Sequence, residues 1–163
     1  MDLIGALAEF DGWHVAPLEV LAAREWRGGD LRVLEAAVSD EQLGVAASWV
    51  VKALLERGEA RLDMGRVFEV LEGAEDWEVQ LHLLQSVRFA PSAAVGQVAA
   101  VRQLCSAKRA MVRVWAVDAF VRIAVVSGAG LEDAREMVER GLADGPASMR
   151  ARCRALEKLI GGI

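Results

Sequence analysis

The amino-acid sequence predicts an all-α fold: an α-solenoid of about five antiparallel helix pairs that forms one domain over residues 1–163. Two observations predict it. Apolar residues recur at helical spacing throughout, and no segment alternates apolar and polar residues between the turn signals of a β-hairpin. A shared pattern also begins at Leu43, Val79, Val112 and Met149, at separations of 36, 33 and 37 residues. A period of this length is typical of stacked helix pairs.

The segment from Met111 to Val126 is the most apolar part of the chain. Its only charged residues are Arg113, Asp118 and Arg122, and it contains no Gly or Pro. Apolar residues around most of its circumference predict a helix that neighbouring helices cover on several sides.

The first 27 residues are expected to form a capping pair. A short helix from Leu3 to Phe10 is expected to end at Asp11-Gly12, and Pro17 starts a second helix that reaches about Trp26. The sequence Arg27-Gly28-Gly29 then predicts a break in the helical pattern.

Residues 30–58 are expected to form the next pair. Asp30 is the expected cap of a helix that runs through Val38. Ser39 and Gln42 have the spacing of a capping box, which predicts a longer helix from about Asp40 to Arg57.

The remaining pairs are expected at residues 61–90, 92–126 and 130–161. In the first of these, Asp63 and Asp76 can cap the two helices, and Gly73 lies between them. Pro91 restarts the chain as a helix. Glycine-containing turns at 127–130 and 145–146 separate the helices that follow.

The second helices of the last four pairs resemble those of the HEAT-repeat family, in particular the short bacterial HEAT-like repeats that also occur in phycobilisome lyases. That family's second helix begins with Asp, a short gap and Val-Arg, followed by Ala and Ala-Leu. Asp76 with Val79-Gln80, Val112-Arg113 and Met149-Arg150 stand at those places, whereas Gly44 and Gln80 replace the usual Arg. Over residues 30–161, the resemblance implies a right-handed stack whose second helices line a concave face.

Equivalent positions on successive second helices would form ladders across that face. One ladder reads Ala46, His82, Trp115, Arg152, and another reads Trp49, Gln85, Asp118, Ala155. Trp beside His and Arg is typical of interaction hot spots, although Trp49 and Trp115 could instead pack between neighbouring repeats. The partner-binding residues predicted for the concave face are Trp49, Glu78, His82, Gln85, Trp115, Asp118, Arg122 and Arg152.

Two pairs of charged residues share a helix face at a spacing of four, Glu78 with His82 and Asp118 with Arg122. Such pairs can be catalytic, but they are also common on helix surfaces, and we expect the latter here. The last helix is basic, which predicts either a solvated face or a surface for an acidic partner. Its basic patch consists of Arg150, Arg154 and Lys158, next to Arg152.

Signatures of enzymes are missing from the sequence. The two histidines, His14 and His82, lie far apart, and neither cysteine has the spacing of a metal ligand. Gly128-Ala129-Gly130 follows a predicted helix and lacks the third glycine of a dinucleotide-binding loop. We therefore expect a non-catalytic protein with no metal and no cofactor.

Charge is sorted along the chain, which has a net charge of -5. Residues 1–80 carry 7 Lys and Arg against 17 Asp and Glu, a net charge of -10, whereas residues 81–163 carry 12 against 7, a net charge of +5. This polarity predicts that the two halves meet different surfaces, unless it reflects solvated faces sorted by chance.

The cysteines and the N-terminus predict a cytoplasmic protein. Cys105 and Cys153 both fall in helical apolar patterns, as expected for reduced core thiols. The first residues carry Asp2 and no basic flank, which argues against a secretory signal. No run reaches the roughly 18 uncharged apolar residues of a membrane span, so we expect no contact with a membrane.

Three functions are therefore ranked. The first is a scaffold that binds a protein partner through the concave face, as a monomer or weak homodimer. The second is nucleic-acid binding, because HEAT-like DNA glycosylases resemble this architecture and use Trp, Asp and Arg on the concave face. Trp115, Asp118 and Arg152 match those residue types, but an acidic N-terminal half would repel phosphate. The third, a role like that of phycobilisome lyases, is implied by the resemblance alone.

Overall fold

The structure is a computed structural model that describes residues 2–162, and these residues form helices and no strand. The predicted all-α class is therefore confirmed. The α-helices are α1 (Leu3–Ala8), α2 (Ala16–Ala23), α3 (Gly28–Ala37), α4 (Gly44–Glu56), α5 (Met64–Glu69), α6 (Trp77–Ser86), α7 (Val98–Leu104), α8 (Ala110–Ser127), α9 (Leu131–Asp144) and α10 (Ala147–Ile160). Short 3-10 segments are η1 (Val70–Glu72), η2 (Val87–Phe89) and η3 (Pro91–Gln97).

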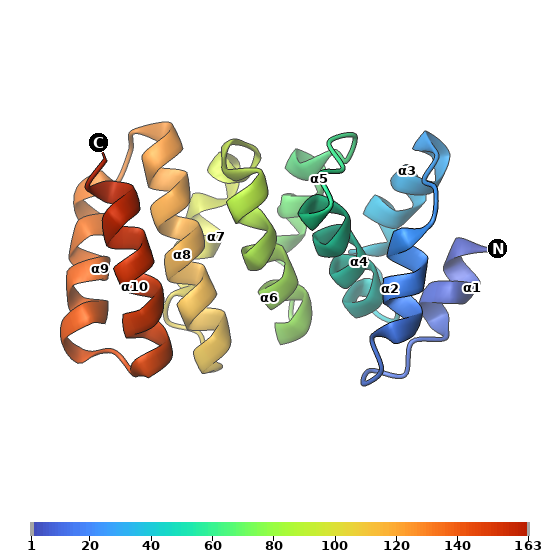
Figure 1. The fold of residues 1–163 in the computed structure, drawn as a ribbon, viewed down its shortest axis with the longest axis horizontal. Coiled ribbons are helices and arrows are strands. Elements are labelled where there is room, and N and C mark those ends of the chain that lie inside the picture. The colour runs from blue at the N-terminus through green and yellow to red at the C-terminus, as the bar shows by residue number, and fades with distance from the viewer. Residues whose placement is uncertain (1, 163) are drawn as a thin grey trace.

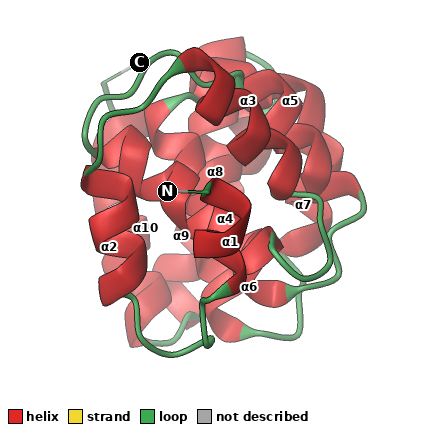
Figure 2. Cartoon of the chain, turned by 90° about the vertical axis from the view of Figure 1, so that its right-hand side faces the viewer, coloured by secondary structure: helices red, strands yellow, loops and turns green. Residues whose placement is uncertain are grey.

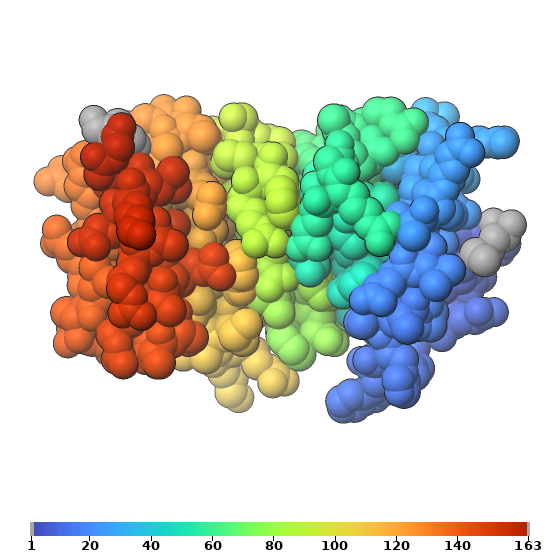
Figure 3. Space-filling view, in the orientation of Figure 1, coloured from blue at the N-terminus to red at the C-terminus, as the bar shows by residue number. Residues whose placement is uncertain are grey.

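The helices follow one another in chain order along the long axis of the molecule, from α1 and α2 at one end to α9 and α10 at the other (Figure 1). In the series α2, α4, α6, α8 and α10, each helix contacts the next. The end view places α3, α5 and α7 on the side opposite α2 and α10 (Figure 2). The even-numbered helices thus form one continuous face, which we call the second-helix face (Figure 3).

The central helix α8 is covered on several sides, as its apolar sequence predicts. It contacts α6, α7, α9 and α10. Eleven of its 18 residues are buried, including Val112, Phe120 and Ile123. The outer helix α9 buries only Ala134, Val138 and Gly141 and carries charge on its exposed side. This contrast places the core of the C-terminal half around α8.

Two predicted helix caps are confirmed. The Asp63 carboxylate accepts a hydrogen bond from the Arg66 backbone N–H at 3.2 Å and begins α5. The Asp76 carboxylate accepts from the Glu78 backbone N–H at 2.8 Å and begins α6. Each carboxylate satisfies an N–H group that has no acceptor within its own helix.

The predicted break at Arg27-Gly28-Gly29 is wrong. α3 begins at Gly28, after an extended Arg27, so Asp30 lies in the first turn and is not the cap. Both glycines are helical, because the first turn needs no intrahelical acceptors for its N–H groups and tolerates weak helix formers. The preceding helix α2 ends at Ala23, three residues before the predicted end at Trp26.

The predicted capping box of Ser39 and Gln42 is also wrong. The Ser39 hydroxyl donates to the Ala36 carbonyl oxygen at 3.1 Å, at the end of α3. Instead, the Asp40 carboxylate accepts from the backbone N–H groups of Gln42 and Leu43 at 2.9 and 3.0 Å. These bonds form a turn, and α4 begins after it at Gly44.

The helix predicted after Pro91 is divided into two parts. Residues Pro91–Gln97 form the 3-10 segment η3, and only Val98–Leu104 form the α-helix α7. Val95 and Val98, which the helical pattern would bury, are 39% and 37% exposed, whereas Val101 is buried. A 3-10 segment turns every three residues, so its side chains leave the α-helical stripe.

Gly141 allows α9 and α10 to approach each other closely. A Cβ atom at Gly141 would collide with Cys153 Sγ and lie 3.2 Å from Met149 Cγ. We expect Gly141→Ala to lower the free energy of unfolding by about 1 to 3 kcal/mol in urea denaturation, because overpacking outweighs the gain in helix propensity. Gly65→Ala is the control, since a Cβ there has its nearest neighbour at 3.5 Å. Equal stability of the two variants would contradict this packing.

Candidate functional site

Trp115 of α8 lies between two arginine side chains from neighbouring elements. The guanidinium of Arg152, on α10, is 3.9 Å from the Trp115 ring centroid, and that of Arg88, on η2, is 5.5 Å from it. The tryptophan is only 7% exposed. Of the two alternatives left by the sequence, Trp115 is therefore packed between neighbours, and its ring carries cations on the second-helix face.

Asp118 joins α8 to α10 from a fully buried position. Its Oδ1 accepts a hydrogen bond from Arg122 Nε at 2.6 Å. Its Oδ2 lies 3.5 Å from Arg152 Nη1 and 3.5 Å from Arg122 Nη2. The aspartate side chain has no exposed surface, whereas Arg122 and Arg152 are 27% and 29% exposed. The pair at spacing four is thus formed, but it belongs to an ion triad that spans two helices.

Glu56 and Lys52 extend this arrangement to α4. Glu56 Oε1 accepts from Arg88 Nη2 at 2.8 Å and lies 3.6 Å from Lys52 Nζ. The joined side chains therefore reach from α4 over η2 and α8 to α10. We call them the arginine–tryptophan network, which consists of Lys52, Glu56, Arg88, Trp115, Asp118, Arg122 and Arg152.

Trp49 borders the network at its α4 end. The Lys52 ammonium is 5.8 Å from the Trp49 ring centroid, and Trp49 is half-buried against the core. Gln85, the next residue in the same predicted ladder, is half-buried on α6. Trp49 therefore offers part of an aromatic surface beside the cations.

His82 pairs with a residue that the sequence analysis did not select. His82 Nδ1 lies 3.0 Å from the hydroxyl oxygen of Ser48, a buried residue of α4. Burial, and secondarily the ammonium of Lys52, lower the pKa of His82 to about 4. The Ser48 hydroxyl also donates to the Val45 carbonyl oxygen at 3.1 Å. Because Ser48 has no exposed surface, the pair joins α4 to α6 and offers no accessible nucleophile.

Glu78, the predicted helix-face partner of His82, forms no printed hydrogen bond or ion pair with it among residues 2–162. Burial and the nearby Asp76 carboxylate raise the pKa of Glu78, while Arg109 opposes that shift. Glu78 thus lies in the first turn of α6, outside the arginine–tryptophan network.

The low pKa of His82 predicts a loss of stability in mild acid. The unfolded chain takes up the His82 proton near pH 6.5, but the folded chain only near pH 4, so protonation in this interval favours unfolding. We expect the free energy of unfolding to fall by about 2 kcal/mol from about pH 7.5 to about pH 5 through this residue. Urea denaturation of His82→Gln should show that much less pH dependence than the native chain.

His14→Gln is the matched control for this pH dependence. His14 is exposed and pairs with Asp11 at 2.6 Å, and this hydrogen bond raises the pKa of His14 instead of lowering it. Its replacement should leave the loss of stability in acid in place. An unchanged acid response in His82→Gln would show that His82 is not held neutral by the fold.

The predicted basic patch on α10 lies beside the network and is not joined to it by any described contact. Arg150, Arg154 and Lys158 are exposed. Arg150 Nη1 donates to the Gly145 carbonyl oxygen at 2.6 Å and so holds the turn before α10. Of the basic residues predicted on this helix, only Arg152 enters the arginine–tryptophan network.

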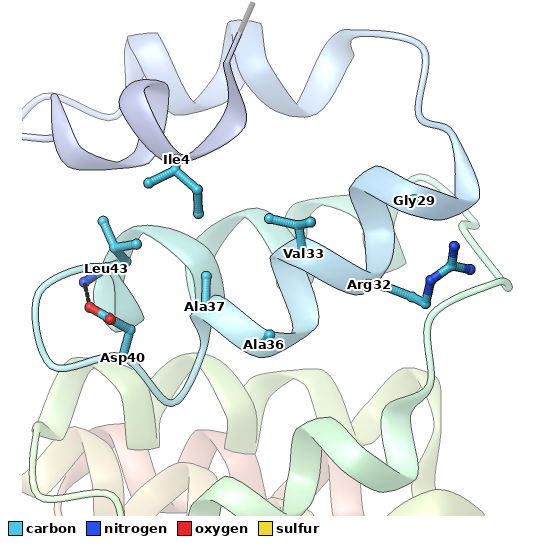
Figure 4. A pocket seen from close by; sticks show the side chains of 8 residues that line it. All are labelled: Ile4, Gly29, Arg32, Val33, Ala36, Ala37, Asp40 and Leu43. Atoms are coloured by element: carbon cyan, nitrogen blue, oxygen red, sulfur yellow. Dashed lines mark hydrogen bonds between the residues drawn. The ribbon is translucent and has the colours of Figure 1, made fainter.

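A separate hollow lies at the N-terminal end, between α1 and α3 (Figure 4). It has a volume of about 590 Å³, and Ile4, Val33, Ala37 and Leu43 line its apolar part. Ile4 and Val33 are 41% and 42% exposed. The hollow shares no residue with the arginine–tryptophan network, so the two are distinct surfaces.

The described part of the chain offers donors and aromatic surface and no recognisable catalytic group. Residues 2–162 contain no cluster of three His, Cys, Asp or Glu side chains arranged to hold a metal ion. No helix within this range is long and apolar enough to span a membrane. The arrangement of arginines around Trp115 and Asp118 can bind an anionic or hydrogen-bond-accepting surface. The chain matches no protein-family model, no curated protein and no solved structure.

Proposed function

We propose that this protein is an α-solenoid of HEAT-like helix pairs and a non-catalytic scaffold whose second-helix face binds a segment of a partner protein. The observation that carries the proposal is the arginine–tryptophan network, which runs over α4, η2, α8 and α10 on one face. Arg and Trp are the residue types most enriched in interaction hot spots. A rigid set of these side chains loses little entropy on binding.

The packing of the helices supports the solenoid part of the proposal. Each even-numbered helix from α2 to α8 contacts the next even-numbered helix, and α9 packs on α10. A helix pair of this size cannot bury its apolar stripe alone, so stacking on its neighbours completes the core. The charged outer side of α9 suits the end of such a stack. Arg135, Glu136, Glu139 and Arg140 are exposed there.

The surroundings of Asp118 favour the protein scaffold over base excision. A glycosylase aspartate must reach the nucleotide, but Asp118 is fully buried and its two oxygens are held by Arg122 and Arg152. Trp115 is covered by Arg152 and has little free ring surface. Both residues therefore support the second-helix face from within and do not project from it.

The two cysteines support a cytoplasmic location. Cys105 and Cys153 are both free, and Cys153 is fully buried. Reduced core thiols of this kind suit a reducing compartment. We place the scaffold there, as a monomer that meets its partner through one face.

Photo-crosslinking in cells tests the scaffold proposal. A benzophenone amino acid in place of Gln85 puts the probe on α6, next to the network, and the same substitution at Arg135 puts it on the outer helix α9. We expect a discrete protein adduct from position 85 and none from position 135. The adduct should disappear when Trp115→Ala and Arg152→Glu are combined, with the helical circular dichroism unchanged. Equal adducts from both positions, or an adduct with nucleic acid, would overturn the proposal.

A further inference from the structure

The arginine–tryptophan network contains more positive than negative groups. Its cations are Lys52, Arg88, Arg122 and Arg152, and its carboxylates are Glu56 and Asp118, which leaves a net charge of +2. Asp118 alone serves two of the arginines, Arg122 and Arg152. Such a local excess of positive charge attracts an anionic partner.

Arg152 has most of its hydrogen-bonding capacity unused. A guanidinium has five N–H donors, and within residues 2–162 that of Arg152 has one acceptor, Asp118 Oδ2 at 3.5 Å. None of its nitrogen atoms is both buried and unpaired, so the other donors face solvent. Stacking on Trp115 at 3.9 Å fixes the plane of the group and leaves its edge open.

Arg122 and Arg88 add donors on either side of Arg152. Arg122 uses Nε and one Nη on Asp118 and remains 27% exposed. Arg88 uses Nη2 on Glu56 and remains 33% exposed. Three guanidiniums are thus held in place around Trp115 and Asp118 before any partner is bound.

We propose that the partner segment is acidic and that its carboxylates bind the open edges of Arg122 and Arg152, with Arg88 on the other side of Trp115. This inference rests on the proposed scaffold function and names the chemistry of its partner. A carboxylate matches the fork of a guanidinium with two parallel hydrogen bonds. The half-buried Trp49 at the α4 end of the network provides a contact for an apolar residue of the same segment.

The distribution of charge selects an acidic peptide over a nucleic acid. Residues 1–80 carry a net charge of -10, so the positive surface ends at α4. A nucleic-acid strand has phosphates at regular intervals and would meet this acidic half as it runs along the molecule. A protein segment can confine its carboxylates to the part that lies over α8 and α10.

Fluorescence anisotropy with defined peptides tests the inference on the full chain. The probe is a fluorescein-labelled peptide of about twelve residues with alternating Glu and Leu, and its counterparts are the same peptide with Gln for Glu and a single-stranded DNA of about the same length. We expect binding of the Glu peptide that weakens as salt is raised, and no comparable binding of the Gln peptide. We also expect Arg152→Gln to weaken binding of the Glu peptide about tenfold.

Arg154→Gln is the matched control, because it removes the same charge from the same helix outside the network. It should change the affinity less than about twofold. Arg152→Gln should remain folded, since Asp118 keeps its shorter hydrogen bond to Arg122 at 2.6 Å, and thermal unfolding checks this. An equal loss in both variants, equal binding of the Gln peptide or tighter binding of DNA would each overturn the inference. A photo-adduct at position 85 without binding of the Glu peptide would overturn it while leaving the scaffold function in place.

Discussion

Replacing Phe120 by alanine is expected to lower the free energy of unfolding by about 3 to 5 kcal/mol. Phe120 lies in the middle of α8 and is 2% exposed, so its removal leaves a cavity where α8 meets its neighbours. Gly130, which begins α9, packs near the end of the ring, and the Arg102 guanidinium lies 5.6 Å from the ring centroid. Urea denaturation followed by circular dichroism measures the loss.

Phe89→Ala is the matched control for Phe120→Ala. Phe89 is 41% exposed in η2, where it stacks on Arg88 at 4.6 Å. Its loss should cost about 1 kcal/mol or less, because the ring is already in contact with water. A loss at Phe120 no larger than at Phe89 would mean that α8 is not the centre of the core.

Asp118→Ala is expected to lower the free energy of unfolding by about 2 to 3 kcal/mol. The buried carboxylate holds Arg122 on its own helix and Arg152 on α10, and its loss leaves both guanidiniums without their counter-ion. The expected loss is at the lower end for a broken buried pair, since both arginines keep over a quarter of their surface in water. Thermal and urea unfolding both measure it.

Glu136→Ala provides the comparison at the same helical spacing. Glu136 pairs with Arg140 at 2.7 Å, but both side chains are about two-thirds exposed, at 67% and 68%. Water screens this pair, so its removal should cost less than about 0.5 kcal/mol. If Asp118→Ala cost no more than Glu136→Ala, the ion triad would be a surface feature without a structural role.

The helix positions that could be predicted are those governed by one residue and its nearest neighbours. The side chains of Asp63 and Asp76 cap the helices that begin after them, because each carboxylate needs only the N–H groups two or three residues away. Ser39 failed as a cap because two local acceptor and donor patterns competed, and Asp40 formed the turn instead. The 3-10 geometry after Pro91 depends on packing against α5 and α8, which the local sequence does not encode.

The candidate site was predictable only in part, because its contacts join residues about one repeat apart. The sequence placed Trp115 and Arg152 at equivalent positions of successive helices, and the two side chains stack. It did not identify Arg88 or Ser48. A signal was present in each case: Ser48 is a polar residue inside an apolar stretch, and Arg88 follows Glu56 by 32 residues, close to the repeat period. How deeply Trp115 is covered depends on the rotamers of Arg88 and Arg152, which no residue spacing determines.

The close approach of Gly141 to Cys153 makes this thiol a chemical probe of local unfolding. Cys153 is fully buried under α9, so a thiol reagent reaches it only when α9 separates from α10. Burial, together with the Asp118 carboxylate, also raises the pKa of the Cys153 thiol, which slows its reaction in the closed state. The rate of labelling at Cys153 therefore reports the free energy of opening the C-terminal helix pair, separately from the unfolding of the whole chain.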